Sequence, residues 1–199
     1  MKQIQLLALG DMDLDQVRKL APALSAAMQR KCEVLRPEID ISAAFNRNRG
    51  QYSSTELLAG IASLETPETW RLLAIASADL YIPILTFVFG EAQLDGLAAI
   101  VSTSRLRQEF YGLPADEELL NQRLLKEAVH ELGHTLGLTH CDDVECVMAA
   151  SHAVEWIDLK SSRFCSKCGA VAAEQSAHCV REPGYAGLAT GWRRRDTEL

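Results

Sequence analysis

The sequence predicts a layered, mixed α/β fold, and three observations lead to that prediction. Apolar runs of strand length alternate with segments in which apolar residues recur at the helical period. Of the 199 residues, 48% are hydrophobic, so the chain can bury a substantial core. After Gly137 the regular periods vanish and cysteines become frequent. We therefore expect one domain over residues 1–199, with an N-terminal subdomain over 1–137 and a C-terminal subdomain over 138–199.

The first part of the chain is expected to form strand, helix, strand and helix in turn. Residues 2–9 are expected to form a strand, and residues 13–30 repeat apolar side chains at the helical spacing. Asp13 can cap this helix, whereas Pro22 predicts a kink or break within it. Residues 32–35 suggest a second strand, and Gly50 marks a loop over residues 47–51. A second helix is expected to open at residues 53–56 and to continue to about residue 64.

Three further strands and one long helix follow. The strands are expected at residues 71–76, 85–90 and 97–103, with Gly96 separating the last two. An apolar face on residues 116–137 predicts the helix. Much of that face consists of Leu119, Leu120, Leu124, Ala128 and Leu132. No strand is indicated after Gly137.

Charge and apolar run length exclude two classes of partner. The formal net charge is −7, whereas a nucleic-acid scaffold needs a basic surface, so we expect no nucleic-acid binding. The basic run of Arg193, Arg194 and Arg195 is interpreted as a solvated tail, with a partner-docking patch as the alternative. No apolar run approaches the ~18 residues that span a bilayer, so no membrane association is expected. The apolar stretch at residues 4–9 is too short for a signal peptide. We expect a cytoplasmic monomer.

The segment HELGHTLGLTH holds three of the five histidines of the chain. His130 and His134 are four residues apart on the expected helix, so both side chains project from one face. Gly137 can end the helix with a sharp turn, after which His140 can supply a third nitrogen. Three nitrogen ligands and one open position describe a catalytic zinc site. Core packing does not explain three clustered imidazoles, because each would need a polar partner.

Glu131 follows the first of these histidines, where its carboxylate can face a metal-bound water. The pKa of such a water falls to roughly 7 on zinc. Glu131 would act as the general base when hydroxide attacks a peptide carbonyl, and would then return the proton to the leaving amine. The sequence thus indicates hydrolysis of a peptide or protein substrate, with Glu131 as the catalytic residue.

The extended motif HExxHxxGxxH resembles that of the metzincin clan of zinc metallopeptidases. The resemblance implies a methionine-containing turn beneath the metal. Met148, eight residues after His140, fits this position. The alternative is a methionine that only fills the core.

Four cysteines after the histidines form two pairs. Cys141 and Cys146 have the spacing C-x₄-C, and Cys165 and Cys168 have the spacing C-x₂-C. Gly169 suits the tight turn of a zinc knuckle. Two such pairs that converge would form a closed, structural tetrahedral zinc site. Disulfides and unrelated free thiols are the alternatives, and the expected cytoplasmic location argues against disulfides.

Four other residues are weaker candidates. Cys32 is expected to be a buried small hydrophobe. Either His178 or Cys179 could replace one of the predicted ligands. His152 is near enough in sequence to approach either site, but we interpret it as a surface or supporting histidine.

The order of these motif residues from His130 to Cys168 resembles one family, the archaemetzincins. The resemblance implies a compact metzincin-like fold with a twisted mixed sheet, an active-site helix and a small zinc-stabilised C-terminal lobe. It therefore implies two Zn²⁺ ions, one catalytic and one structural. It also implies an antiparallel edge strand over residues 85–91, along which a substrate could add as a further strand. The residues expected to bind the substrate there are Phe87, Val88, Phe89 and Gly90.

Two other functions are considered. The chain could be a zinc-stabilised binding module with the same fold and little activity, but a structural site would not need Glu131. Cys141 could occupy the open position of the catalytic zinc and silence it. Adjacent residues rarely ligate one tetrahedral ion, and Cys141 is better explained as a ligand of the cysteine site together with Cys146.

Overall fold

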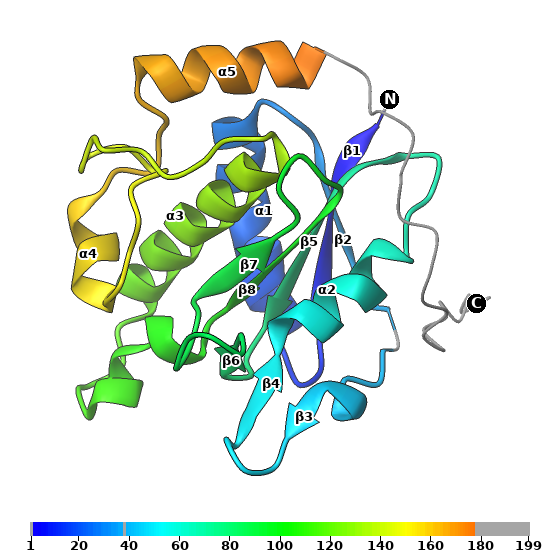
Figure 1. Ribbon diagram of the computed structural model, residues 1–199, viewed down its shortest axis with the longest axis vertical. Helices are drawn as coiled ribbons and strands as arrows, with labels where there is room; N and C mark the ends of the chain where they lie inside the picture. Colours follow the sequence, from blue (N-terminus) through cyan, green and yellow to red (C-terminus); the bar gives the residue numbers. More distant parts are fainter. Residues whose placement is uncertain (1, 38, 178–199) are drawn as a thin grey trace.

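A five-stranded mixed sheet organises the molecule (Figure 1). The computed structural model describes residues 2–37 and 39–177. In spatial order the strands are β2 (Cys32–Leu35), β1 (Gln3–Leu9), β5 (Thr69–Ala76), β8 (Ala98–Ser102) and β7 (Gly90–Ala92). The first four are parallel, and β7 pairs antiparallel with β8 at the edge. The predicted mixed α/β class with an antiparallel edge strand is confirmed.

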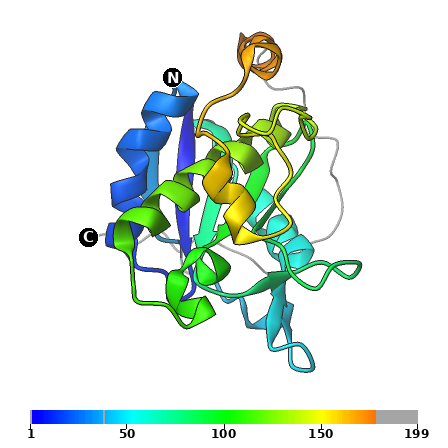
Figure 2. The same cartoon turned by 90° about the vertical axis from the view of Figure 1, so that its left-hand side faces the viewer.

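Helices cover both faces of this sheet. The helices α1 (Leu14–Met28) and α3 (Glu117–Thr135) pack on one face, and α2 (Ser54–Ala62) packs on the other (Figures 1 and 2). Every residue of β5 and β8 is buried. Because parallel strands between two helical layers are buried on both sides, they are nearly continuous apolar runs in the sequence.

The polar residues at the starts of the helices cap them as their sequence position suggests. The side chain of Asp13 accepts a hydrogen bond from the backbone of Asp15 in the first turn of α1. Asp116 accepts one from the backbone of Leu119 at the start of α3, at 2.9 Å. Pro22 does not end α1, which continues to Met28. Pro22 lies on the exposed face of that helix, so the carbonyl that it leaves without a helical donor can bind water.

A small second sheet was not predicted. It consists of β3 (Phe45–Asn46), β4 (Gln51–Ser53) and β6 (Leu80–Tyr81). Three short 3-10 turns also lie in the described chain: η1 (Ser42–Ala44), η2 (Ser104–Leu106) and η3 (Gln108–Tyr111). Strands of two or three residues are too short for a periodic signal, so the sequence showed only the loop around Gly50.

The strand expected at residues 85–90 is wrong. The edge strand is β7, which begins at Gly90, and residues 82–89 form an irregular connection that we call the rim segment. In the rim segment only Val88 makes a strand-like bridge, to Leu80. Side chains bind other carbonyls of this segment: Arg49 donates to Leu85 O at 3.1 Å, and Gln51 donates to Thr86 O at 3.0 Å. Backbone groups satisfied in this way do not require a ladder partner.

Two helices follow α3, where no regular element was predicted. The helix α4 (Val154–Leu159) packs along α3, held by an ion pair of 2.7 Å between Arg123 and Asp158 (Figure 2). The helix α5 (Ser166–Ala177) lies across one end of the molecule (Figures 1 and 2). None of the helices in the described part of the chain is long and apolar enough to cross a lipid bilayer.

Candidate active site

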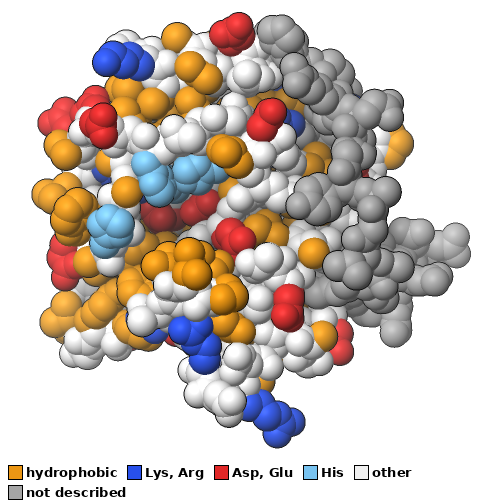
Figure 3. All heavy atoms as spheres, in the orientation of Figure 1, with side chains coloured by type: hydrophobic (Ala, Val, Ile, Leu, Met, Phe, Trp, Pro, Cys, Tyr) orange, Lys and Arg blue, Asp and Glu red, His pale blue; other side chains and the backbone are white. Residues whose placement is uncertain are grey.

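A cleft of ≈550 Å³ lies between the rim segment with β7 and the C-terminal half of α3. The segment after Met148 closes its far side with Ala150, Ser151 and His152. Figure 3 shows histidine side chains gathered above acidic side chains in a hollow, with apolar side chains beside them. The residues predicted for the histidine site therefore share one cleft with the residues predicted to bind substrate.

His130 and His134 are oriented by backbone carbonyls. The two residues lie one turn apart on α3, and their rings are 4.7 Å apart between centroids. The Nδ1 atom of His130 is 2.8 Å from Val147 O, and the Nδ1 atom of His134 is 2.7 Å from Leu138 O. A carbonyl can only accept, so each Nδ1 must carry the proton and donate it. Each Nε2 then presents a lone pair.

The arrangement of these lone pairs fits a bound cation. The two Nε2 atoms lie 3.1 Å apart, and two acceptors at this distance repel each other unless a cation lies between them. Burial lowers the pKa of His130 well below its usual range, and it also lowers the pKa of His134. The neutral imidazole that ligates a metal is thus favoured at both positions. A carbonyl that accepts from the other ring nitrogen is the usual support of a histidine ligand.

His140 reaches the same point through the turn at Gly137. Gly137 has φ +80°, and its backbone donates to His134 O at 2.9 Å, so the helix ends in a left-handed residue as predicted. The ring of His140 lies 5.3 Å from that of His130 and 5.1 Å from that of His134. One ligand atom from each of the three residues lies within 4.8 Å of the others. The structure therefore brings the three predicted ligands together.

Glu131 is a buried carboxyl at the base of the cleft. It is 5% exposed, and burial raises its pKa well above the usual range, with the charge of Glu127 adding to the effect. Its side chain packs against the backbone of Gly90: a Cβ at position 90 would lie 2.6 Å from Glu131 Oε1. Only glycine at the start of β7 allows the carboxyl to occupy this place. A carboxyl that is easily protonated can both accept and donate a proton near neutral pH.

Sequence reasoning missed a buried ion pair under the histidines. Glu127 lies one turn before Glu131 on α3, and its Oε1 is 2.8 Å from Lys160 Nζ, with both side chains at most 4% exposed. Lys160 also donates to Ala149 O at 3.2 Å and lies 3.4 Å from His130 Nδ1. The four-residue spacing of Glu127 and Glu131 could have indicated the acid. No local pattern marks Lys160.

Met148 packs against the helix that carries the histidines. It is fully buried, and a Cβ on Gly133 would collide with its sulfur. Its carbonyl accepts a hydrogen bond of 3.0 Å from the backbone of Cys141. Met148 thus lies between α3 and the segment that follows His140.

The four predicted cysteine ligands converge beside this segment. Their sulfur atoms lie within 4.8 Å of one another, in the set Cys141, Cys146, Cys165 and Cys168. The sulfurs of Cys141 and Cys165 are 3.8 Å apart, too far for a disulfide and close to the about 3.8 Å edge of a tetrahedral zinc–thiolate site. The backbone N–H of Cys168 lowers the pKa of the Cys165 thiol to about 7, which favours the thiolate that binds metal. Among the described residues the disulfide alternative is wrong.

Some smaller expectations need correction or fall outside the described residues. Gly169 does not form a knuckle turn; it lies in the first turn of α5, where its backbone donates to Cys165 O at 2.8 Å. Cys32 is only partly buried on β2, and burial raises its pKa to about 11. His178, Cys179 and the three arginines at 193–195 lie outside the described residues.

The chain is similar to known proteins in both sequence and fold. The sequence pattern of peptidase family M54 matches residues 28–173. An archaemetzincin from Methanocaldococcus jannaschii is 43% identical over 160 residues, which cover 80% of this chain and 86% of that protein. An archaemetzincin crystal structure from Methanopyrus kandleri superposes with a TM-score of 0.77 at 34% identity, covering 89% of this chain and 96% of that one. A zinc-dependent peptidase from Methanocorpusculum labreanum gives a TM-score of 0.77 at 30% identity, covering 85% and 99% of the two chains.

Proposed function

This chain belongs to peptidase family M54, and on that premise we propose that it hydrolyses peptide bonds with a zinc ion held by His130, His134 and His140. The observation that carries the proposal is the convergence of two histidine acceptors, 3.1 Å apart, beside a buried carboxyl. The substrate is a peptide or protein that enters the cleft.

Zinc in this site would activate a water molecule and polarise the scissile carbonyl. Glu131 acts as the general base: a carboxylate oxygen takes the proton of the attacking water and delivers it to the amide nitrogen that leaves. The contact with Gly90 holds this carboxyl at the start of β7, which we take as the edge beside the substrate. The closed surroundings of Glu131 keep bulk water from competing for the proton.

The substrate backbone is proposed to lie along β7 and the end of the rim segment. β7 is the last strand of its sheet, so one of its edges has no partner strand among the described residues. An extended peptide can add there through main-chain hydrogen bonds. Phe87, Val88, Phe89 and Gly90 line the cleft at this edge and would contact substrate side chains.

A second zinc ion is proposed at the cysteine cluster, where four thiolates leave no open position. This ion would be structural. Residues 138–177 then form a C-terminal lobe that supplies the third histidine, Met148 and all four cysteines. Because Cys141 follows His140 directly, the lobe presents the third ligand of the catalytic site.

The decisive experiment compares cleavage of a peptide library by the wild type and by Glu131→Gln. Loss of the general base should lower kcat/KM by about 10²–10⁴ while zinc content stays unchanged. Glu118→Gln is the matched control, because Glu118 lies exposed on the same helix and should behave as wild type. Equal cleavage by wild type and Glu131→Gln would overturn the mechanism. Peptide binding without cleavage in the wild type would support a binding module instead.

A further inference from the structure

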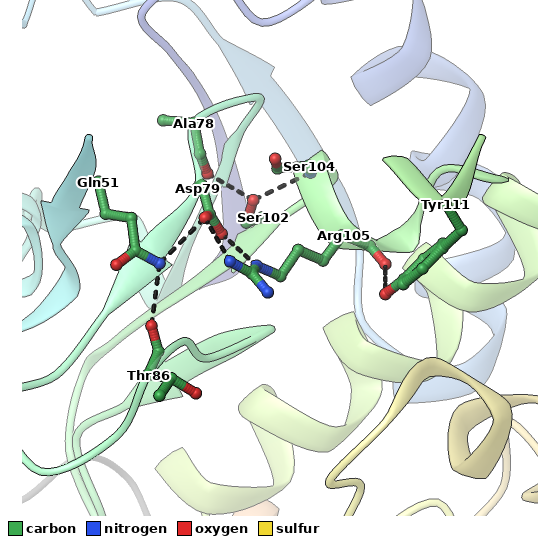
Figure 4. Close-up of polar contacts among 8 residues, drawn as sticks. All are labelled: Gln51, Ala78, Asp79, Thr86, Ser102, Ser104, Arg105 and Tyr111. Atoms are coloured by element: carbon green, nitrogen blue, oxygen red, sulfur yellow. Dashed lines mark hydrogen bonds and ion pairs between the residues drawn. The ribbon is translucent and has the colours of Figure 1, made fainter. Parts of the chain in front are cut away.

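The rim segment is held by a network of side chains that takes no part in the proposed chemistry (Figure 4). Asp79, directly before β6, is the centre of this network. Its carboxylate binds Arg105 through two hydrogen bonds, of 2.7 Å to Nε and 2.8 Å to a terminal nitrogen. Gln51 of β4 donates to the same carboxylate at 3.0 Å and, from the same nitrogen, to Thr86 O at 3.0 Å. The network therefore ties the rim segment to β4 and to the turn after β8.

Both the backbone and the side chain of Arg105 are held by neighbouring residues. Its backbone carbonyl accepts a hydrogen bond of 3.0 Å from the Tyr111 hydroxyl (Figure 4). Its guanidinium lies 4.2 Å from the ring centre of Phe87 and 4.7 Å from that of Phe110. Only 22% of this side chain is exposed, and a guanidinium that is paired with a carboxylate and lies over two aromatic rings has little freedom.

Phe87 is thereby held as part of the cleft wall. It lines the cleft and contacts Phe89 edge to face, with ring centres 5.2 Å apart. Phe89 is 5% exposed and belongs to the main core, so the pair of rings links the wall to the core. The charge of Arg105 is neutralised by Asp79, so this wall presents an apolar surface to a bound side chain.

We infer that the Asp79–Arg105 pair is a positioning device that fixes Phe87 as the wall of a subsite for an apolar substrate side chain. The inference rests on the proposed peptidase function and adds a substrate class to it. Leu85, which is 49% exposed at the cleft and lies in the rim segment with Phe87, extends the same apolar character. An apolar side chain that contacts these groups loses water on both surfaces, whereas a charged one would lose hydration without finding a partner on this wall.

The test uses quenched peptides that vary one position at a time around the bond that the wild type cleaves, as located by mass spectrometry. The variable residue is Leu, Phe, Ala, Asp or Lys. One position should prefer Leu or Phe over Asp by at least about tenfold in kcat/KM. Phe87→Ala and Arg105→Met should flatten that preference at the same position, mainly through KM, and should leave the other positions and the zinc content unchanged.

A double variant separates positioning from general stability. If Arg105 acts through Phe87, Phe87→Ala combined with Arg105→Met should show the same selectivity as Phe87→Ala alone. Arg105→Lys keeps the charge but not the paired geometry, so it should retain part of the preference and serves if Arg105→Met does not fold. Arg18→Met removes an exposed ion pair remote from the cleft and is the control.

Each failure has its own signature. Cleavage by the wild type with no apolar preference at any position would overturn this inference and leave the peptidase proposal intact. Undiminished selectivity in Arg105→Met and Arg105→Lys would overturn the role of Arg105. If the wild type cleaves no peptide, the peptidase proposal is overturned. The subsite at Phe87 is then tested by measuring the binding of the same peptides with fluorescence anisotropy. Equal affinity for the Leu and Asp peptides would overturn the apolar subsite as well.

Discussion

At the scale of single residues, the carboxyl proposed as the general base depends on a neighbour with no side chain. Glu131 packs against Gly90 so closely that a methyl group at position 90 would overlap its carboxyl oxygen. That methyl group would also lie 2.7 Å from the carbonyl of Ile100 on β8. The position of the Glu131 carboxyl therefore depends on glycine at the start of the edge strand.

Gly90→Ala should displace the Glu131 carboxyl and reduce activity while the zinc ligands remain. A displacement of about 1 Å can cost about 10²-fold in rate, and we expect a loss of kcat/KM of this order. Peptide cleavage and zinc content are the two measurements. Gly169→Ala is the control, because its added Cβ would make only an ordinary contact, 3.8 Å from Phe164. A Gly90→Ala enzyme with full activity would show that the carboxyl tolerates the methyl group.

The buried pair of Glu127 and Lys160 gives a prediction about stability. Lys160→Met should lower the free energy of unfolding by about 3–5 kcal/mol, because it leaves a carboxylate buried without its counter-charge. Combining Lys160→Met with Glu127→Gln removes both charges and should restore most of that loss. Chemical denaturation of the wild type, the single variant and the double variant measures the difference. Equal destabilisation in the single and double variants would contradict the ion-pair account.

The convergence of the three histidines was predictable from sequence because spacing on a helix fixes direction. His130 and His134 share a face of α3, and a glycine three residues later permits the turn that brings His140 back. Lys160 and Arg105 were not predictable, because their partners lie 33 and 26 positions away in sequence: Glu127 and Asp79. Such contacts depend on how whole elements pack.

At the scale of elements, the end of α3 is held by an arginine from the sheet. Arg71 on β5 is 7% exposed, and its Nε donates to Thr135 Oγ1 at 3.1 Å. A terminal nitrogen of the same side chain donates to Thr135 O at 3.3 Å. These bonds supply donors to the hydroxyl and the carbonyl of Thr135, which ends the helix directly after His134.

Arg71→Met should therefore weaken both the fold and the site. We expect a loss of about 2 kcal/mol in the free energy of unfolding, because buried acceptors lose their donor. Zinc affinity at the histidine site should fall as well, since the last turn of α3 carries His134. Thermal unfolding and competition with a chelator give the two readouts. Destabilisation without any change in zinc affinity would show that the last turn keeps its geometry without Arg71.

The wrong strand at residues 85–90 has a physical explanation at this scale. The apolar run Leu-Thr-Phe-Val-Phe has the composition of a strand, but the ring of Phe87 makes a cation–π contact and the ring of Phe89 packs in the core. Only the end of the run meets neighbouring strands, where Val88 bridges to Leu80 and Phe89 O accepts from Ser102 at 2.8 Å. Arg49 and Gln51, more than 30 residues earlier, satisfy the freed carbonyls. The six-residue helix α4 and the twelve-residue helix α5 were missed because no amphipathic period of helical length is evident in the sequence after Gly137.

At the scale of the whole molecule, the two proposed metal sites share one stretch of backbone. His140 and Cys141 are adjacent, and Cys141 donates its backbone hydrogen to Met148 O, beneath α3. The chain between the sites cannot relax independently, so the cysteine cluster should support the position of His140. The alternation of strands and helices predicted the layers, whereas this coupling needed the structure.

The coupling predicts that damage to one site affects the other. Purified wild type should contain two zinc ions per chain. Cys165→Ser should lose the structural ion and weaken zinc binding at the histidines by about 10–100-fold. His134→Ala should lose only the catalytic ion and keep the fold. A single zinc ion, unaffected by Cys165→Ser, would contradict the two-site arrangement.

The shortness of β7 has a further consequence. An open strand edge is a template on which identical molecules can polymerise, and proteins commonly limit this hazard by keeping such edges short. With three residues from Gly90 to Ala92, β7 offers few main-chain groups to a second copy. The irregular rim segment ends the regular edge on one side, and a turn at Gly96 ends it on the other. An edge of this size would suit a brief encounter with an extended segment, and its shortness limits pairing between two copies of the protein.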